Sequence, residues 1–252
     1  MQFPFGKPVQ TVKQTDCSPK KVFVLGVYAS AVHAKWLTPK GERSVEALAV
    51  ASEPYIFWRG ENAQYYFPEI SREVGTLVPA GEQFNGPSGR ALDDRIIKPL
   101  GYTRNDCWLC DLVPHSCVNT RQRDAIRRAY NPLVEKFGLT AHTAPDVPKK
   151  LTDGKRRDEI YGELVQSKAT KLVLLGDMPI KWFVHHYDIR WEKLSDFIHA
   201  GKGYGKPVEA KIGDVSLEIL PFAHPRQIAQ LGVSSAEWFN IHEEWMRCRT
   251  GT

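Results

Sequence analysis

Three side chains, far apart in the chain, have types and local settings that suit chemistry. His224 stands directly before Pro225 at the end of an apolar run, where a histidine is seldom needed for packing and can stabilise developing negative charge. Asp111 lies within another apolar run, and an ionised carboxylate there can only accept hydrogen bonds. Phe84 precedes two closely spaced glycines, so its ring is suited to stacking on a flat ligand, with a place in the hydrophobic core as the alternative.

Short apolar runs predict the buried strands that would carry these residues. The runs cover residues 21–26, 107–113, 171–176, 208–212 and 215–220. The last two flank Gly213-Asp214, a pair typical of a hairpin turn. Because continuous apolar runs suit strands covered on both faces, we expect an α/β fold, a three-layer α/β/α sandwich with a central, mostly parallel sheet.

Helical patterns separate these strands. They cover residues 88–99, 121–137, 158–167 and 234–247, with a further helix through Trp182. Ser234 or Ser235 is the expected N-cap of the last helix. In open α/β sheets ligands bind beyond the carboxyl ends of the strands, so chemistry is expected in the loops that follow them. These loops come after Gly26, Val113, Gly176 and Leu220.

Composition limits the class of protein. The 252 residues are 42% hydrophobic, which suits one large core, so we expect a single domain over 1–252. The sequence has no apolar run long enough for a membrane helix and no secretory leader pattern at its start, so we expect a monomeric, cytoplasmic protein that does not bind membranes. Five unevenly spread cysteines fit a reducing compartment. A net charge of +5 favours contact with phosphates but fits a solvated surface as well.

Four segments together resemble the uracil-DNA glycosylase superfamily. The closest is Gln83-Phe-Asn-Gly-Pro-Ser-Gly-Arg-Ala-Leu-Asp93, which resembles the Phe-x-Gly-x-x-Gly-x-x-Leu-Asp segment of the iron–sulfur branches. Gly26-Val-Tyr-Ala-Ser30 is similar in position to the first motif of the superfamily, the water-positioning loop. The run 107–113 resembles the strand with a base-reading asparagine, and 220–225 resembles the last strand with its His-Pro loop. Order and spacing make the four segments specific together.

The resemblance implies a DNA glycosylase, which swings a base out of the stack and hydrolyses its N-glycosidic bond. Phe84 would stack on the base, Asp111 would read its edge, and His224 would stabilise charge on the departing base. Two further groups would contact DNA, the first at a helix start where free N–H groups attract phosphate. These residues are Gly86, Ser88 and Gly89, followed by Arg226 and Gln227.

The first motif departs from the superfamily, which usually places Asp, Asn or Glu there to orient water. No carboxylate follows the first strand before Glu42, so Tyr28, Ser30 and His33 are the local candidates for that role. His33 fits a helix surface equally well. A protein that binds bases or abasic sites without cutting them is the alternative from another class, and a hydrolase of free nucleosides is a third.

The second departure concerns the base. Asp111 stands where the pyrimidine-reading asparagine is expected; an ionised carboxylate favours an amino group such as cytosine N4 and repels uracil O4. We therefore expect a modified cytosine as substrate, for example in phage DNA with a role in defence, in preference to uracil in base excision repair. The alternative for Asp111 is a structural cap or ion pair.

No cofactor or metal is expected. Iron–sulfur relatives use four cysteines, and only Cys117 falls near an expected position. Cys107 and Cys110 lie on one strand with side chains on opposite faces, which does not suit chelation. We expect no separate lyase step, because Lys35 is interpreted as an exposed helical lysine.

Overall fold

The computed structural model describes residues 1–199, 203–231 and 236–250, and the chain forms two compact units. The first unit consists of Met1–Val12, Ala29–Pro87 and His115–Lys149. The second unit consists of Lys13–Tyr28, Ser88–Pro114 and Lys150–Thr252. The single domain expected over 1–252 stays a prediction.

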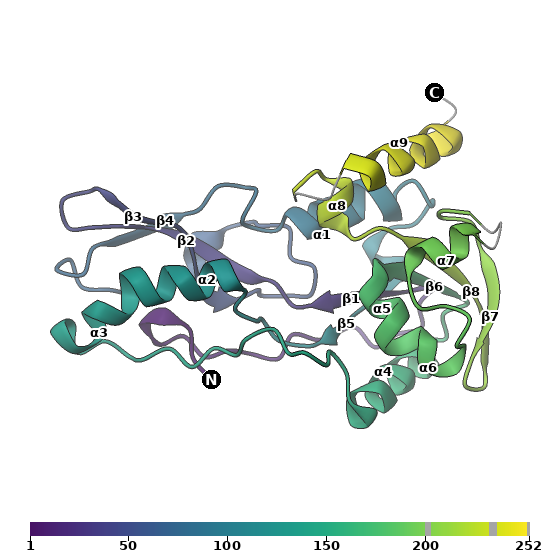
Figure 1. Ribbon diagram of the computed structural model, residues 1–252, viewed down its shortest axis with the longest axis horizontal. Helices are drawn as coiled ribbons and strands as arrows, with labels where there is room; N and C mark the ends of the chain where they lie inside the picture. Colours follow the sequence, from purple (N-terminus) through teal and green to yellow (C-terminus); the bar gives the residue numbers. More distant parts are fainter. Residues whose placement is uncertain (200–202, 232–235, 251–252) are drawn as a thin grey trace. The chain divides into compact units, whose positions relative to one another are not determined.

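The second unit contains a mostly parallel sheet, as the apolar runs predicted (Figure 1). Its strands are β1 (Val22–Tyr28), β5 (Cys107–Val113), β6 (Lys171–Leu175), β7 (Val208–Ile212) and β8 (Val215–Phe222). Their order is β5-β1-β6-β8-β7, and only β7 runs antiparallel to its neighbour. All seven residues of β5 are buried, which explains why its sequence is continuously apolar except at one position.

Helices of the second unit pack on this sheet, with α4 against β5, α5 beside β1 and α7 against β8. The expected helices are confirmed, and Ser234 and Ser235 lie outside the described residues. The helical segments are α1 (Pro87–Leu92), η3 (Asp93–Ile97), η4 (Arg104–Asp106), α4 (Gly154–Ser167), α5 (Asp177–Pro179), η6 (Ile180–Val184), α6 (His185–Tyr187), α7 (Leu194–His199), α8 (Pro225–Ile228) and α9 (Ala236–Thr250). Asp153 caps α4, because its carboxylate accepts the N–H of Arg156 at 2.7 Å.

The first unit contains a small antiparallel sheet that sequence analysis did not predict. Its strands are β2 (Ala31–Leu37), β3 (Arg43–Ser52) and β4 (Thr76–Pro79), in the order β3-β2-β4. Its helical segments are η1 (Pro4–Gly6), η2 (Ala63–Tyr66), α2 (Thr120–Ala125), η5 (Ile126–Tyr130) and α3 (Asn131–Phe137). His33 and Lys35 lie on β2, so placing either on a helix surface was wrong.

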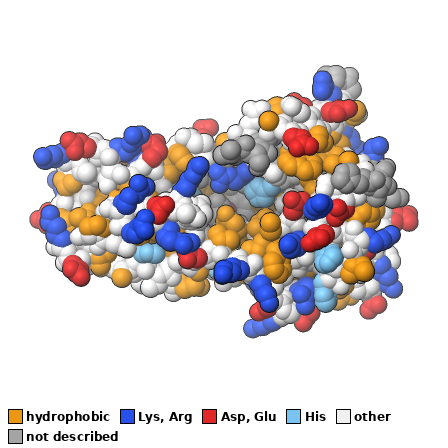
Figure 2. Space-filling view, viewed as in Figure 1, with side chains coloured by type: hydrophobic (Ala, Val, Ile, Leu, Met, Phe, Trp, Pro, Cys, Tyr) orange, Lys and Arg blue, Asp and Glu red, His pale blue; other side chains and the backbone are white. Residues whose placement is uncertain are grey.

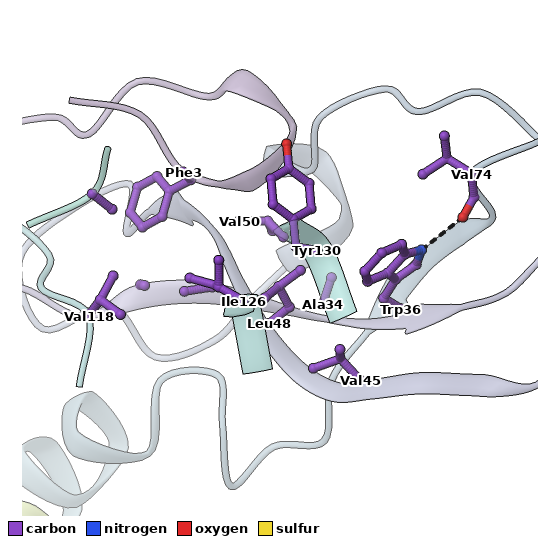
Figure 3. Close-up of a cluster of buried hydrophobic side chains, with 13 residues drawn as sticks. Phe3, Ala34, Trp36, Val45, Leu48, Val50, Val74, Val118, Ile126 and Tyr130 are labelled. Carbon is purple, nitrogen blue, oxygen red and sulfur yellow. Dashed lines mark hydrogen bonds between the residues drawn. The ribbon is translucent and has the colours of Figure 1, made fainter. Parts of the chain in front are cut away.

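A cluster of buried hydrophobic side chains forms the core of the first unit (Figure 3). Trp36 from β2 and Tyr130 from η5 are almost completely buried, and their rings meet edge to face at 6.4 Å. Trp36 also donates its indole N–H to the carbonyl oxygen of Val74 at 3.1 Å. The indole is therefore buried without losing its hydrogen bond, as a stable core requires.

Candidate functional site

The carboxyl ends of the parallel strands gather the candidate residues of the second unit. Asp111 on β5 lies in register with Gly26 on β1, and His224 follows the end of β8. Two strands, β1 and β6, separate β5 from β8, so the strand axes that carry Asp111 and His224 are about 14 Å apart. This edge is where ligands bind in open α/β sheets.

Asp111 is buried, and its carboxyl group lacks a hydrogen-bond partner among the described residues. Its residue is 4% exposed, and no side chain or backbone group in the described ranges donates a hydrogen bond to its carboxyl group. Burial raises the pKa of Asp111 to about 7, against the opposing effect of the Arg156 charge. A buried polar group without a partner costs about 1–3 kcal/mol, so this carboxyl group is a candidate for binding a ligand.

Arg156 does not neutralise Asp111, because its guanidinium is committed elsewhere. It donates to the backbone oxygens of Asp111 at 2.7 Å and Leu112 at 3.1 Å. The same group pairs with Glu159 at 3.0 Å and Glu163 at 3.3 Å. Arg156 therefore fixes the backbone at the end of β5 and leaves the Asp111 carboxyl group available.

His224 is held in one protonation state and one orientation. Its Nδ1 accepts the backbone N–H of Arg226 at 3.2 Å, and the backbone N–H of His224 donates to Oε1 of Gln227 at 3.1 Å. These two hydrogen bonds cap α8. Burial lowers the pKa of His224 to about 4, and the Arg226 charge adds to the effect. The ring is therefore neutral near pH 7 with its proton on Nε2, since Nδ1 is an acceptor.

The Nε2–H of His224 has no acceptor among the described residues. Gly176, which follows β6, packs against the same histidine: with its φ of +89°, a Cβ at this position would lie 3.3 Å from the His224 Cβ. The loops after β6 and β8 are therefore in close contact. Arg226 is exposed beside it, whereas Gln227 takes part in the cap.

In the first unit, His33 is fixed to the segment that carries Phe84. Asn85 is buried, accepts the His33 backbone N–H at 2.8 Å and donates to the His33 carbonyl oxygen at 2.9 Å. Gly86 has a φ of +68°, and a Cβ there would lie 2.0 Å from the Arg59 carbonyl carbon. Only glycine fits at this position. The half-buried Phe84 directly precedes Asn85 and Gly86, so the side-chain hydrogen bonds of Asn85 hold its segment against the backbone of His33.

Glu53 is a buried carboxylate that sequence analysis missed. Its residue is 2% exposed, and its oxygens accept the backbone N–H groups of Ser30 at 3.0 Å and Trp58 at 3.2 Å. The chain has no carboxylate between the first strand and Glu42, and the fold brings that of Glu53 to the backbone of Ser30. The pairing of β2 with β3, which sets Ala31 opposite Ser52, is the signal that would have found it.

The remaining predicted residues divide between the units. Ser30, His33, Phe84 and Gly86 belong to the first unit, and Tyr28, Ser88, Gly89, Asp111, His224, Arg226 and Gln227 belong to the second. Asp111 and His224 share one sheet edge, and His33 lies beside the segment of Phe84 and Gly86. The convergence of Phe84 with Asp111 and His224 on one cavity stays a prediction.

No group of three or more His, Cys, Asp or Glu side chains suited to a metal ion occurs in residues 1–199, 203–231 and 236–250. Cys107 and Cys110 are buried on β5, and burial raises the pKa of the Cys107 thiol to about 12. Lys35 pairs with Glu46 at 3.5 Å on the small sheet. Among the described helices, none has the length and apolar character needed to cross a membrane.

Comparison with models of known protein families gives no match to this chain, and comparison with curated proteins gives none.

Proposed function

We propose that this protein is a DNA glycosylase that flips out a modified cytosine and hydrolyses its N-glycosidic bond, leaving an abasic site. The proposal includes a uracil-DNA glycosylase-like fold, with the sheet of the second unit at the centre of a three-layer α/β/α sandwich. The observation that carries it is a pair of polar groups with hydrogen-bonding capacity left at one sheet edge, the Asp111 carboxyl and the His224 Nε2–H. A ligand that touches both groups would lie across the carboxyl ends of β1 and β6, which separate β5 from β8.

Asp111 would read the edge of the extruded base. With a pKa of about 7, the carboxyl group is ionised in part of the molecules and protonated in the rest at neutral pH. The ionised form accepts from the amino group of cytosine, and the protonated form can also donate to the neighbouring ring nitrogen. Uracil O4 repels the ionised form, so uracil should be a poorer substrate, particularly above pH 7.

His224 would stabilise the departing base. A neutral imidazole whose Nδ1 is already occupied presents Nε2–H as a fixed donor, and a preorganised donor lowers the energy of the charge that builds on the base as the bond breaks. The proton stays on the histidine, because a neutral imidazole is a weak acid. Tyr28, Ser30 and His33 are the proposed candidates for holding the attacking water.

Exposed arginines supply a surface for the DNA backbone. Lys and Arg side chains gather over α2 of the first unit (Figure 2), where four arginines of α2 and η5 are exposed. They are Arg121, Arg123, Arg127 and Arg128. Arg123 pairs with Asp146 and Arg127 with Asp124, which leaves the other two better placed to contact phosphates.

An assay for abasic sites tests the proposal. Duplexes carrying 5-hydroxymethylcytosine, cytosine or uracil at one position are incubated with the protein and then with hot alkali, and strand breaks at that position are expected for 5-hydroxymethylcytosine. His224→Asn keeps an N-cap acceptor for the Arg226 N–H but lacks the imidazole donor, so excision should fall about 100-fold or more. His186→Asn, at an exposed histidine, is the matched control and should excise normally.

The second candidate is a binder of bases or abasic sites that does not cut. It is favoured by one observation: the carboxylate nearest Ser30, that of Glu53, accepts two backbone N–H groups and so has less capacity to hold water. A salt-dependent gel shift without strand breaks would support this candidate and overturn the glycosylase. Cleavage of free nucleosides without salt-dependent affinity for duplex DNA would instead indicate a nucleoside hydrolase.

A further inference from the structure

A chain of buried hydrogen bonds in the second unit ends one residue before His224. The carbonyl oxygen of Arg95, on η3, lies 2.9 Å from Nε2 of His242 on α9. Nδ1 of the same histidine lies 2.7 Å from the Tyr204 hydroxyl, which accepts the backbone N–H of Ala223 at 3.2 Å. His242 and Ala223 are fully buried, and Tyr204 is 8% exposed, so water does not compete for these groups.

The direction of every hydrogen bond in this chain follows from chemistry. A carbonyl oxygen only accepts, so His242 must donate from Nε2 to Arg95. Burial lowers the pKa of His242 to about 4, so the ring is neutral and Nδ1 is an acceptor. The Tyr204 hydroxyl therefore donates to Nδ1, and its oxygen lone pairs remain for the N–H of Ala223. No link can reverse without breaking another, which makes the chain a rigid positioning device.

Packing around the chain keeps it in place. Phe222, the last residue of β8, meets the Trp245 ring of α9 edge to face at 4.8 Å. Gly205 has a φ of +63°, and a Cβ there would lie 2.5 Å from the indole nitrogen of Trp245, so α9 and the end of β8 are in close contact. An ion pair between Arg95 and Glu243 joins the same helix to η3.

We propose that Tyr204 and His242 are positioning residues that hold the His224 loop in its working orientation. They touch no substrate. They fix the backbone of Ala223, which directly precedes His224 in the chain. The proposal rests on the role of His224 in the proposed function. It assigns α9 a part in catalysis that sequence analysis did not foresee.

Tyr204→Phe tests the proposal, with Tyr161→Phe as a closely matched control. The Tyr161 hydroxyl also accepts a backbone N–H, that of Asp214 at 3.2 Å, but at the turn on the opposite end of β8. Tyr204→Phe should lower kcat for excision about tenfold, because small displacements of a catalytic group are costly, with KM for DNA within about twofold. Tyr161→Phe should leave both unchanged. Equal kcat in the two variants would overturn the proposal.

His242 offers a graded second test. His242→Asn keeps a hydrogen-bond acceptor near the position of Nδ1, whereas His242→Leu removes both ring nitrogens and with them both hydrogen bonds of His242. Excision by the Asn variant should exceed that of the Leu variant by about fivefold, since a satisfied Tyr204 hydroxyl preserves the positioning of Ala223. Indistinguishable activities would show that the hydrogen bonds of His242 do not position the loop.

Nitrogen-15 NMR of the imidazoles separates this proposal from the proposed function. In the parent protein the His224 signals should report a proton on Nε2, and Tyr204→Phe should shift them toward a mixture of tautomers while Tyr161→Phe does not. If the parent excises no base, the glycosylase fails, yet these spectra still decide whether Tyr204 positions His224. Unchanged His224 spectra in Tyr204→Phe would overturn the positioning role.

Discussion

Glu53 in the first unit and Asp111 in the second are both buried carboxyl groups near the end of a strand, but their surroundings differ. Glu53 accepts the N–H groups of Ser30 and Trp58, whereas the Asp111 carboxyl receives no hydrogen bond within the described ranges. The first arrangement ties two loop segments together. The second costs stability without internal compensation, which is the usual state of a group kept for a ligand.

The same contrast extends to neighbouring side chains. Asn85 in the first unit is used fully on the backbone of His33 and Ala80. In the second unit, Nδ1 of His224 takes part in a helix cap, and its Nε2 has no partner among the described residues. We therefore expect loss of the Glu53 side chain to destabilise the protein, and substitution of Asp111 to stabilise it or to change what it binds.

The largest loss of stability is expected for Glu53→Ala. The variant strands two buried backbone N–H groups, each worth about 1–3 kcal/mol, so the free energy of unfolding should fall by about 4 kcal/mol in urea titrations. Glu53→Gln, which keeps one carbonyl acceptor, should lose about half as much. Glu69→Ala, at an exposed position, should stay within about 0.5 kcal/mol. If Glu53→Ala lowered the free energy of unfolding no more than Glu69→Ala, the difference proposed between Glu53 and Asp111 would not hold.

Asp111→Asn is expected to act in the opposite direction. Folding raises the pKa of Asp111 from 3.8 to about 7, so the native state binds this proton more tightly than the unfolded state and stability declines as pH rises from about 4 to about 7. Asparagine does not ionise. At pH 8 the variant should be more stable than the parent by up to about 4 kcal/mol, at roughly 1.4 kcal/mol for each pKa unit.

The gap between Asp111→Asn and the parent should close near pH 4, where the parent carboxyl group is protonated in both states. Asp94→Asn removes an exposed carboxylate that pairs with Lys98 at 2.5 Å, and it should change stability by less than about 1 kcal/mol at either pH. A variant at position 111 that is destabilised at pH 8 would show that the carboxylate has a stabilising partner after all.

The next largest effect is the loss of stability at low pH caused by His224 and His242. It can be measured separately once Asp111 is replaced. Folding lowers the pKa of His224 and of His242 from 6.5 to about 4. The unfolded chain therefore binds their protons first, and stability should fall as pH drops from 6.5 to 4. In the Asp111→Asn background His242 alone should account for about 3 kcal/mol of that fall. Adding His242→Asn should make the pH profile shallower, and an unaltered profile would contradict a buried neutral His242.

The smallest effect concerns the surface of the first unit. Arg121 and Arg128 pair with no carboxylate in the part of the chain that the structure describes. The double variant to glutamine should weaken binding to duplex DNA and reduce the slope of log K against log salt by about 1–2. Arg127→Gln, at an arginine paired with Asp124, should change the slope less. An equal slope for all three proteins would exclude this helix from contact with DNA.

The parallel strands could be predicted from sequence, because strands buried on both faces are written as continuous apolar runs. β1, β5, β6 and β8 each show such a run, and the turn at Gly213-Asp214 fixed the hairpin. Because parallel strands share one carboxyl edge, Asp111 and His224 were expected at the same edge from sequence, whereas the order of the strands between them comes only from the structure.

The antiparallel sheet could not be predicted in the same way. In β2 the alternation of buried and half-buried residues is hidden by small residues, since Ala31 and Ala34 suit a helix as well as a strand. Glu53 was missed for the same reason, because only the pairing of β2 with β3 brings it to Ser30, 23 positions earlier. The chain of hydrogen bonds through Tyr204 and His242 likewise depends on tertiary packing, since Arg95 and His242 are 147 positions apart in the sequence.

The most direct test of the account compares excision by the parent and by Asp111→Asn on otherwise identical duplexes that carry uracil or 5-hydroxymethylcytosine, at pH 8. An asparagine amide donates to O4 and accepts from N3–H of uracil, whereas the ionised aspartate favours an amino group. The parent should prefer 5-hydroxymethylcytosine, and Asp111→Asn should shift the ratio of kcat/KM values toward uracil by at least about tenfold. The same base preference in both proteins would contradict the assignment of Asp111 as the base-reading residue.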